Sequence, residues 1–212
     1  MLYRLNVSRR KFLSRATLGL YAIGKSTAAT ASPADRLSSF GFTLDFTQAS
    51  AAGDARAQLL ANLNRQLQAI HQLPLSETFG RFIVSQPIVV DRELDVPGAY
   101  RRGVGVRVPA GFPAEAGPVI LHELVHAFHD QKLAGGWKNP TPIAFHHDAV
   151  ARRLYPARAV AMRNAIEYLA YCATAVMVGT IERAPFTRAA VRQNQPDFEI
   201  WIAATFMEGE GA

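Results

Sequence analysis

The residues of this chain best suited to chemistry are His122, Glu123 and His126, which form the pattern His-Glu-x-x-His. Residues four apart on an α-helix lie one above the other, so both imidazoles can bind one metal ion. Imidazole is a common zinc ligand, and zinc lowers the pKa of bound water so that Glu123 can accept its proton. The pattern predicts a Zn2+ site for hydrolysis with Glu123 as general base. Two surface histidines beside an ion-paired glutamate are the alternative.

A catalytic zinc site needs three protein ligands, and three histidines compete for the third position. His129 lies seven residues after His122, a rise of about 10.5 Å, which is too far for two bonds of about 2.1 Å. The adjacent residues His146 and His147 lie on a short expected helix, where neighbouring side chains point apart. Histidine is therefore a poor candidate for the third ligand.

Glu167 is the better candidate for the third ligand. It is a carboxylate among apolar neighbours on an expected helix, and burying an uncompensated charge is costly. A metal ion or hydrogen bonds would compensate it. The alternative is an exposed glutamate on a polar stripe with Asn164 and Tyr171.

The helix that carries the zinc pattern is marked by its own sequence. Pro118 precedes it, apolar residues recur at helical spacing, and Gly135-Gly136 ends it. Because the strands come mainly before the helices, we expect an α+β domain with a short N-terminal mixed sheet, followed by the active-site helix and further helices. Pro87 interrupts one strand and favours an edge or a bulge there. The expected strands cover 42–46, 82–90 and 104–108, and the other expected helices cover 54–73, 140–154, 157–181 and 196–206.

The first 34 residues have the features of an export signal. The segment 8–13, SRRKFL, matches the twin-arginine motif, and a short apolar stretch and a small-residue region with candidate cleavage points after Ala31 and Ala34 follow. The apolar stretch is too short to span a bilayer permanently. We expect a cleaved signal peptide over 1–34, recognised by the twin-arginine translocase, and a periplasmic or secreted domain over 35–212 without a permanent membrane anchor. A frayed basic terminus is the alternative.

The net charge of +6 suggests nucleic-acid binding, but the location of the charge argues against it. Six of the 23 basic residues and none of the 17 acidic residues precede Asp35, so the remainder carries no net charge. We therefore expect no nucleic-acid partner. Cys172 is the only cysteine, which excludes an internal disulfide, and its apolar surroundings favour a core residue over a reactive thiol.

The chain resembles the gluzincin metallopeptidases, and within them the anthrax lethal-factor-like catalytic domains and their small bacterial relatives. The resemblance covers about residues 87–206, most of the expected mature chain. Two of its segments are not general zinc motifs, which makes the match more specific than the zinc pattern alone. Its elements are PGAYRRG at 97–103, LHELVHAFH at 121–129, Asn164 with EYLA at 167–170, and APFTRA at 184–189.

The resemblance implies a zincin-like metalloendopeptidase with zinc bound by His122, His126 and Glu167 and with Glu123 as general base. It also implies that a peptide or protein substrate pairs with an edge strand running from Val104 to Val108. Strand addition at a sheet edge is a common mode of peptide recognition.

Two positions depart from the pattern of these relatives. A tyrosine that stabilises the oxyanion often stands seven residues before the ligand glutamate, where this chain has Val160. An acid often stands four residues after it, where this chain has Tyr171. Loss of an oxyanion donor typically costs about a hundredfold or more in rate. The sequence does not place the hydroxyls of Tyr155, Tyr168 or Tyr171 that would substitute.

These departures support a second hypothesis, a weak or inactive zinc-binding pseudoenzyme that binds a protein or peptide partner. A third hypothesis is a structural zinc domain. Its closed site would need a fourth protein ligand, such as His146 or His147.

Overall fold

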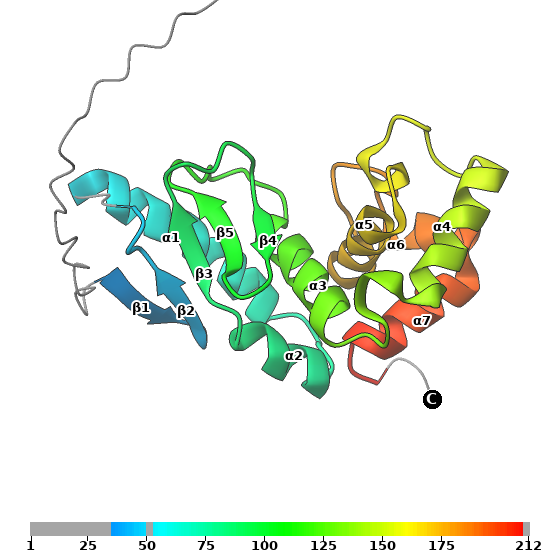
Figure 1. Ribbon diagram of the computed structural model, residues 1–212, viewed down its shortest axis with the longest axis horizontal. Coiled ribbons are helices and arrows are strands. Elements are labelled where there is room, and N and C mark those ends of the chain that lie inside the picture. The colour runs from blue at the N-terminus through cyan, green and yellow to red at the C-terminus, as the bar shows by residue number, and fades with distance from the viewer. Residues whose placement is uncertain (1–34, 50–52, 210–212) are drawn as a thin grey trace, which may run out of the picture. The chain divides into compact units, whose positions relative to one another are not determined.

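Five strands of the described residues form one mixed sheet in the order β1-β2-β3-β5-β4 (Figure 1). The computed structural model describes residues 35–49 and 53–209, so the expected signal peptide lies outside them. β2 and β3 are parallel, as are β3 and β5, whereas the two outer pairs are antiparallel. The strands are β1 (Arg36–Ser39), β2 (Phe42–Asp45), β3 (Ile88–Asp91), β4 (Ala99–Arg101) and β5 (Gly105–Pro109).

The helices confirm the expected α+β class. α5 is the centre of the helical part and packs against α3, α4, α6 and α7. α3 also contacts β4 and β5, so it joins the sheet to the helices. The helices are α1 (Gly53–His71), α2 (Glu77–Val84), α3 (Val119–Gln131), α4 (Pro140–Arg152), α5 (Ala165–Val178), α6 (Arg188–Asn194) and α7 (Pro196–Phe206), with short 3-10 turns η2 (Gly136–Lys138) and η3 (Val160–Met162).

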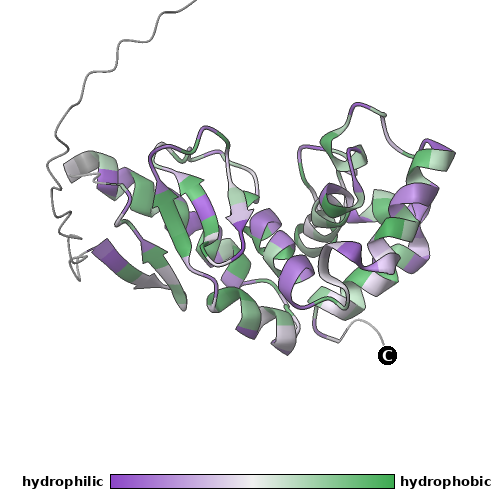
Figure 2. Cartoon of the chain, viewed as in Figure 1, coloured by the Kyte–Doolittle hydropathy of each residue, from purple (hydrophilic) through white to green (hydrophobic). Residues whose placement is uncertain are grey.

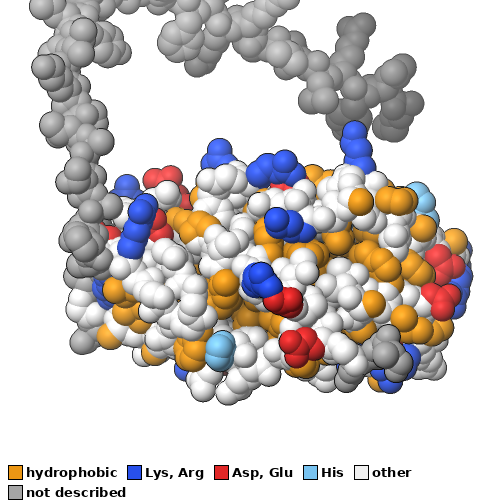
Figure 3. Space-filling model, turned by 90° about the horizontal axis from the view of Figure 1, so that it is seen from below, with side chains coloured by type: hydrophobic (Ala, Val, Ile, Leu, Met, Phe, Trp, Pro, Cys, Tyr) orange, Lys and Arg blue, Asp and Glu red, His pale blue; other side chains and the backbone are white. Residues whose placement is uncertain are grey.

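One continuous hydrophobic core runs through the sheet and the helices. The hydropathy colouring shows hydrophobic residues along the central strands and along α5 (Figure 2). Cys172 belongs to this core, where burial raises the pKa of its thiol, as expected for an unreactive cysteine. On the face seen in Figure 3, hydrophobic side chains reach the surface among charged ones. Within the described ranges, no helix is both long enough and apolar enough to cross a bilayer.

The strand expected over 82–90 is wrong in two respects. Its first residues are helical, and the remainder does not lie at the edge of the sheet. Residues 77–84 form α2, because Ser76 accepts a hydrogen bond from the backbone of Phe79 and caps the helix. Phe79, Phe82 and Ile83 are buried on one helical face. The strand that remains, β3, lies inside the sheet and is not an edge.

The strand over 104–108 is confirmed as β5, but it is not the edge of the sheet. β5 lies between β3 and β4, and β4 is the free strand on that side. The chain reverses through Gly103, which has a φ of 79°, so the residues before the strand pair with it. A Cβ at Gly105 would lie 2.3 Å from the Pro87 carbonyl oxygen, so only glycine allows this packing against β3.

The single helix expected over 157–181 is also wrong. The side chain of Asn164 accepts a hydrogen bond from the Glu167 backbone and starts α5 there, while residues 160–162 form η3. α5 ends at Gly179, which has a φ of 84°. α6 was not expected and begins behind the Thr187 cap. The other expected helices agree with α1, α3, α4 and α7 to within a few residues.

Candidate metal centre

A side chain of α1 caps the N-terminus of α3, the helix that carries the zinc pattern. The first residue before α3, Pro118, makes no side-chain cap, and Gln66 supplies one instead. Its Oε1 accepts a hydrogen bond from the Ile120 backbone at 3.0 Å, and its Nε2 donates to the carbonyls of Ala116 and Gly117 at 3.1 and 2.7 Å. The sequence pattern of α1 indicated only its apolar stripe, so this polar contact could not be predicted from it.

His122, His126 and Glu167 come together between α3 and α5, as predicted. The Nε2 atoms of His122 and His126 lie 3.1 Å apart. The Glu167 Oε2 atom lies 3.5 Å from the first of them, and its Oε1 atom lies 3.6 Å from the second. In the part of the chain that the structure describes, these residues form the one group of three or more donors that could hold a metal ion.

The spacing of the two histidine nitrogens fits a tetrahedral metal ion. Two ligand atoms bound at about 2.1 Å with tetrahedral angles are about 3.4 Å apart, and the two Nε2 atoms lie 3.1 Å apart. The two separations to Glu167 belong to different oxygens of its carboxylate, and one donor atom from each of the three residues lies within 4.8 Å of the others. Burial, followed by the charge of His122, lowers the pKa of His126 to about 3. His126 is therefore neutral near pH 7, with a lone pair available for a cation.

Glu123 is buried beside the metal group, with 8 % of its surface exposed. Burial raises the pKa of Glu123 above its ordinary value, and a hydrogen bond from the Tyr100 backbone opposes that rise. A Cβ at Gly98 would lie 2.5 Å from Val119 and 3.1 Å from the Glu123 side chain, so the loop before β4 can close on α3 only through glycine. A carboxylate with a raised pKa is suited to exchanging protons near neutral pH.

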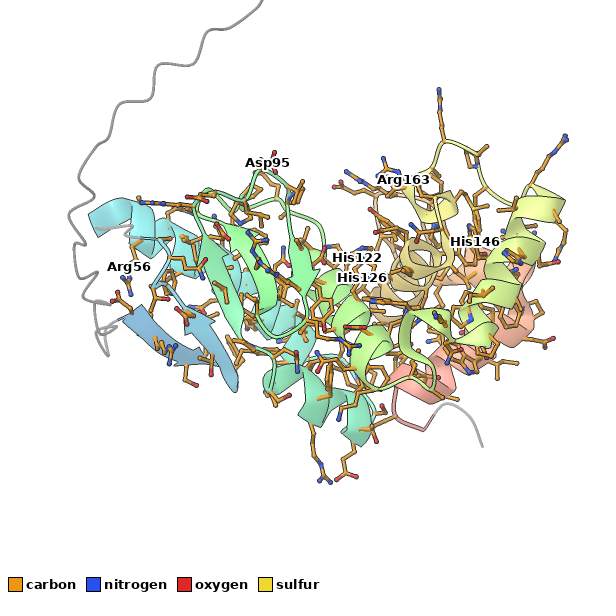
Figure 4. All side chains as sticks on the ribbon, in the orientation of Figure 1. Arg56, Asp95, His122, His126, His146 and Arg163 are labelled. Carbon is orange, nitrogen blue, oxygen red and sulfur yellow. The ribbon has the colours of Figure 1, made fainter. Side chains whose placement is uncertain are left out.

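The metal group opens into a cavity of about 540 Å3. His122 and His126 lie on α3 between β4 and α5, and Arg163 lies on the α5 side (Figure 4). The cavity is lined by residues of α3 and α5 and of the loops on either side of them. The lining residues include Val96, Gly98, Glu115, Val119, His122, Glu123, Val160, Arg163, Glu167, Tyr171, Thr174, Ile181, Glu182 and Arg183.

Asp130, near the end of α3, ties the helix to the hairpin of β4 and β5. It is 5 % exposed and accepts hydrogen bonds from the Tyr100 hydroxyl at 2.9 Å and from the Arg102 Nε at 2.7 Å. The Arg102 side chain also donates to the Asp130 carbonyl oxygen at 2.9 Å. This network gives Tyr100 and Arg102 of the segment at 97–103 a structural role, because it holds β4 alongside α3.

The other histidines do not join the metal group. His129 is buried against Trp137, with ring centroids 5.0 Å apart, and neither of its ring nitrogens has a hydrogen-bond partner within residues 35–49 and 53–209. His146 lies on α4, and its Nε2 atom is 3.2 Å from the Met162 carbonyl oxygen. His146 and His147 are not in the group of donors, so the fourth ligand of a closed structural site is not supplied by them.

The structure settles which of the three tyrosines faces the cavity. The Tyr168 hydroxyl donates to Gln195 at 2.6 Å inside the core, and Tyr155 is also buried away from the cavity lining. Tyr171 lines the cavity with its ring centroid 4.5 Å from that of His122. Val160 lines the cavity too and brings no hydroxyl to it.

Comparisons of the chain with protein-family models, with curated proteins and with solved structures find no match. The function is therefore inferred from the geometry of the chain itself.

Burial of His129 predicts a loss of stability in acid. Burial lowers the pKa of His129 to about 4, below the value of about 6.5 in an unfolded chain, so only the unfolded state takes up a proton between these values. Its contribution to stability is complete above about pH 6.5 and is lost as the pH falls towards 4. When the pH is lowered from 7 to 5, we expect the free energy of unfolding to fall in the wild type. In His129→Gln it should fall by about 2 kcal/mol less.

Urea denaturation at both pH values, with a chelator present to exclude metal binding, measures this difference. Comparing each protein with itself cancels any constant effect of the substitution. An equal loss in both proteins would show that His129 does not cause the acid sensitivity.

Proposed function

We propose that this protein is a zinc-dependent endopeptidase of the gluzincin type. The observation that carries the proposal is the group of donor atoms from His122, His126 and Glu167, one from each residue and all within 4.8 Å of one another, with the buried carboxyl group of Glu123 next to it. The predicted ligand residues come from two separate helices, so sequence spacing alone does not bring them together. Two imidazoles and one glutamate are a known ligand set of catalytic zinc in metallopeptidases, and the adjacent Glu123 completes that pattern.

Each residue of the site has a distinct part in the proposed reaction. A bound zinc ion would supply a water molecule of lowered pKa and a positive charge beside the scissile carbonyl. Glu123 accepts the proton of the attacking water and passes it to the amine that leaves. Its burial favours this exchange because a raised pKa brings the carboxyl group closer to the working pH.

The substrate in this proposal is a peptide that extends along β4. The prediction placed it on the strand from Val104 to Val108, but that strand is covered, and β4 is the free edge beside the cavity. Gly98 and its neighbours Val96 and Pro97 line the cavity directly before β4 begins. An extended peptide paired with β4 would pass over Glu123.

Removal of the metal tests the proposed function. We expect the purified protein to cleave a quenched fluorescent peptide library, to lose at least about 90 % of that activity in chelator, and to recover it with added zinc, because the metal activates the water. Equal cleavage with and without chelator would rule out a metallopeptidase.

The second candidate is a zinc-binding pseudoenzyme that captures a peptide without cleaving it. Val160 favours it, because it faces the cavity where relatives often have an oxyanion donor. This candidate predicts one zinc per chain and saturable peptide binding without turnover. Chelator-sensitive turnover would exclude it.

The site of action is part of the proposal. The twin-arginine signal proposed over 1–34 would direct the domain to the periplasm or the medium, and it lies outside the described residues. A fusion of residues 1–34 to a reporter, exported only while the Arg9-Arg10 pair is present, would support this assignment.

A further inference from the structure

Arg183 is an exposed residue in the wall of the cavity, and its side chain and its backbone each make a hydrogen bond. Its Nη1 atom donates to the Tyr171 hydroxyl at 3.2 Å, and its carbonyl oxygen accepts a hydrogen bond from the Phe186 backbone at 2.8 Å. The loop around it is closed by a hydrogen bond from the Ile181 backbone to the Phe186 carbonyl at 2.7 Å. Residues 184–187 thus belong to the loop that presents this arginine, and residues 188 and 189 begin α6.

The Arg183 guanidinium has N–H donors beyond the one that its hydrogen bond to Tyr171 uses. Arginine carries five N–H donors in a planar fork, and the bond to Tyr171 uses one of them. Among the described residues, Arg183 makes no ion pair, although Glu115 and Glu182 line the same cavity. Both glutamates are exposed. An arginine oriented by a tyrosine but left without a carboxylate is prepared to bind one.

The position of Tyr171 places this donor close to the proposed reaction. Tyr171 follows Glu167 by one turn of α5, a rise of about 6 Å. Successive residues of an extended peptide are about 3.3 Å apart, so this rise corresponds to about two residues of a bound peptide. Arg163 adds a second positive charge on the same wall.

We propose that Arg183, oriented by Tyr171, binds a carboxylate of the substrate and gives this site a preference for acidic peptides. The inference rests on the proposed function for the identity of the ligand as a peptide. An Asp or Glu side chain and a free C-terminus present the same carboxylate chemistry, so the experiment separates them.

Peptide binding tests the proposal without requiring cleavage. The protein is the full-length Glu123→Gln variant loaded with zinc. The probes are fluorescein-labelled peptides that carry a single Glu, or a single Gln, at each position in turn. Each peptide is made with a free C-terminal carboxylate and with a C-terminal amide. We expect either a Glu peptide to bind about tenfold tighter than its Gln counterpart, or the free acids to bind about tenfold tighter than their amides. The neutral peptide of each pair lacks the charge-assisted bond to arginine.

Arg183→Gln should remove this preference and Arg183→Lys should keep part of it. Arg158→Gln is the matched control, because Arg158 is an exposed arginine that does not line the cavity, and it should keep the full preference. A preference confined to internal Glu assigns the carboxylate to a side chain, and one confined to the free acids assigns it to the C-terminus. Equal binding of all pairs, or a preference that survives Arg183→Gln, overturns the proposal.

The two proposals fail in different ways. Cleavage by the wild type without any preference for acidic peptides would leave the peptidase standing and remove the role of Arg183. Selective binding that depends on Arg183, in a protein that cleaves nothing, would leave the carboxylate site standing and remove the peptidase.

Discussion

Substitution of Glu123 by glutamine is expected to reduce peptide cleavage at least about a thousandfold while leaving one zinc per chain. Loss of a general base typically costs about a hundredfold to ten thousandfold in rate. Glu123 is buried and is not one of the three donors of the metal group, so an amide of the same shape leaves the ligands in place. The rate of cleavage of a fluorescent peptide and the zinc content of the same preparation are the two measurements.

Glu115→Gln is the matched control for this variant. Glu115 lines the same cavity but is exposed, and it lies in the loop before α3, away from the donors. We expect it to keep both zinc and at least about half of the activity, since exposed substitutions have small effects. Cleavage by Glu123→Gln at the wild-type rate would remove the proposed mechanism even with zinc present.

Substitution of Glu167 by alanine is expected to weaken zinc binding by at least about a hundredfold, so that the purified variant retains little metal. Even indirect support of a ligand is commonly worth about 10- to 100-fold in affinity, and Glu167 provides a ligand oxygen. The two neutral imidazoles that remain leave a site with two protein ligands, where catalytic zinc has three. Competition with a chromophoric zinc chelator measures the affinity.

Glu182→Ala is a control at the same cavity, because Glu182 is exposed and lies outside the donor group. Far-ultraviolet circular dichroism distinguishes loss of metal from loss of fold. A Glu167→Ala variant that binds zinc as tightly as the wild type would contradict the proposed ligand set. The third ligand would then be another residue, and the gluzincin assignment would fail.

The local features of the site could be predicted from the sequence because they depend on short-range physics. The four-residue spacing of His122 and His126 places both rings on one face of any helix, and the proline and glycines around them mark that helix. The carboxylate of Glu167 was predicted to need a partner because an uncompensated charge is costly among apolar residues, and the structure places it half-buried beside His122 and His126. The α+β class followed in the same way from the order of apolar patterns along the chain.

The tertiary structure decided what depends on contacts between distant segments. Strand order is one example, because pairing of β4 onto β5 depends on a reversal at Gly103, and only that pairing makes β4 the edge. The choice between helix and strand over 82–84 is another, since a short apolar run fits both periods until its packing selects one.

The surroundings of the metal group were also decided by the tertiary fold. Gln66 lies 54 residues before the backbone amide that it caps, and Arg183 lies 12 residues after the tyrosine that orients it. Side chains at such separations meet only when the helices have packed, so no periodicity along the chain records them. The sequence by itself therefore determined the residues that could bind a metal, and the packing of α1, α3 and α5 determined what surrounds them.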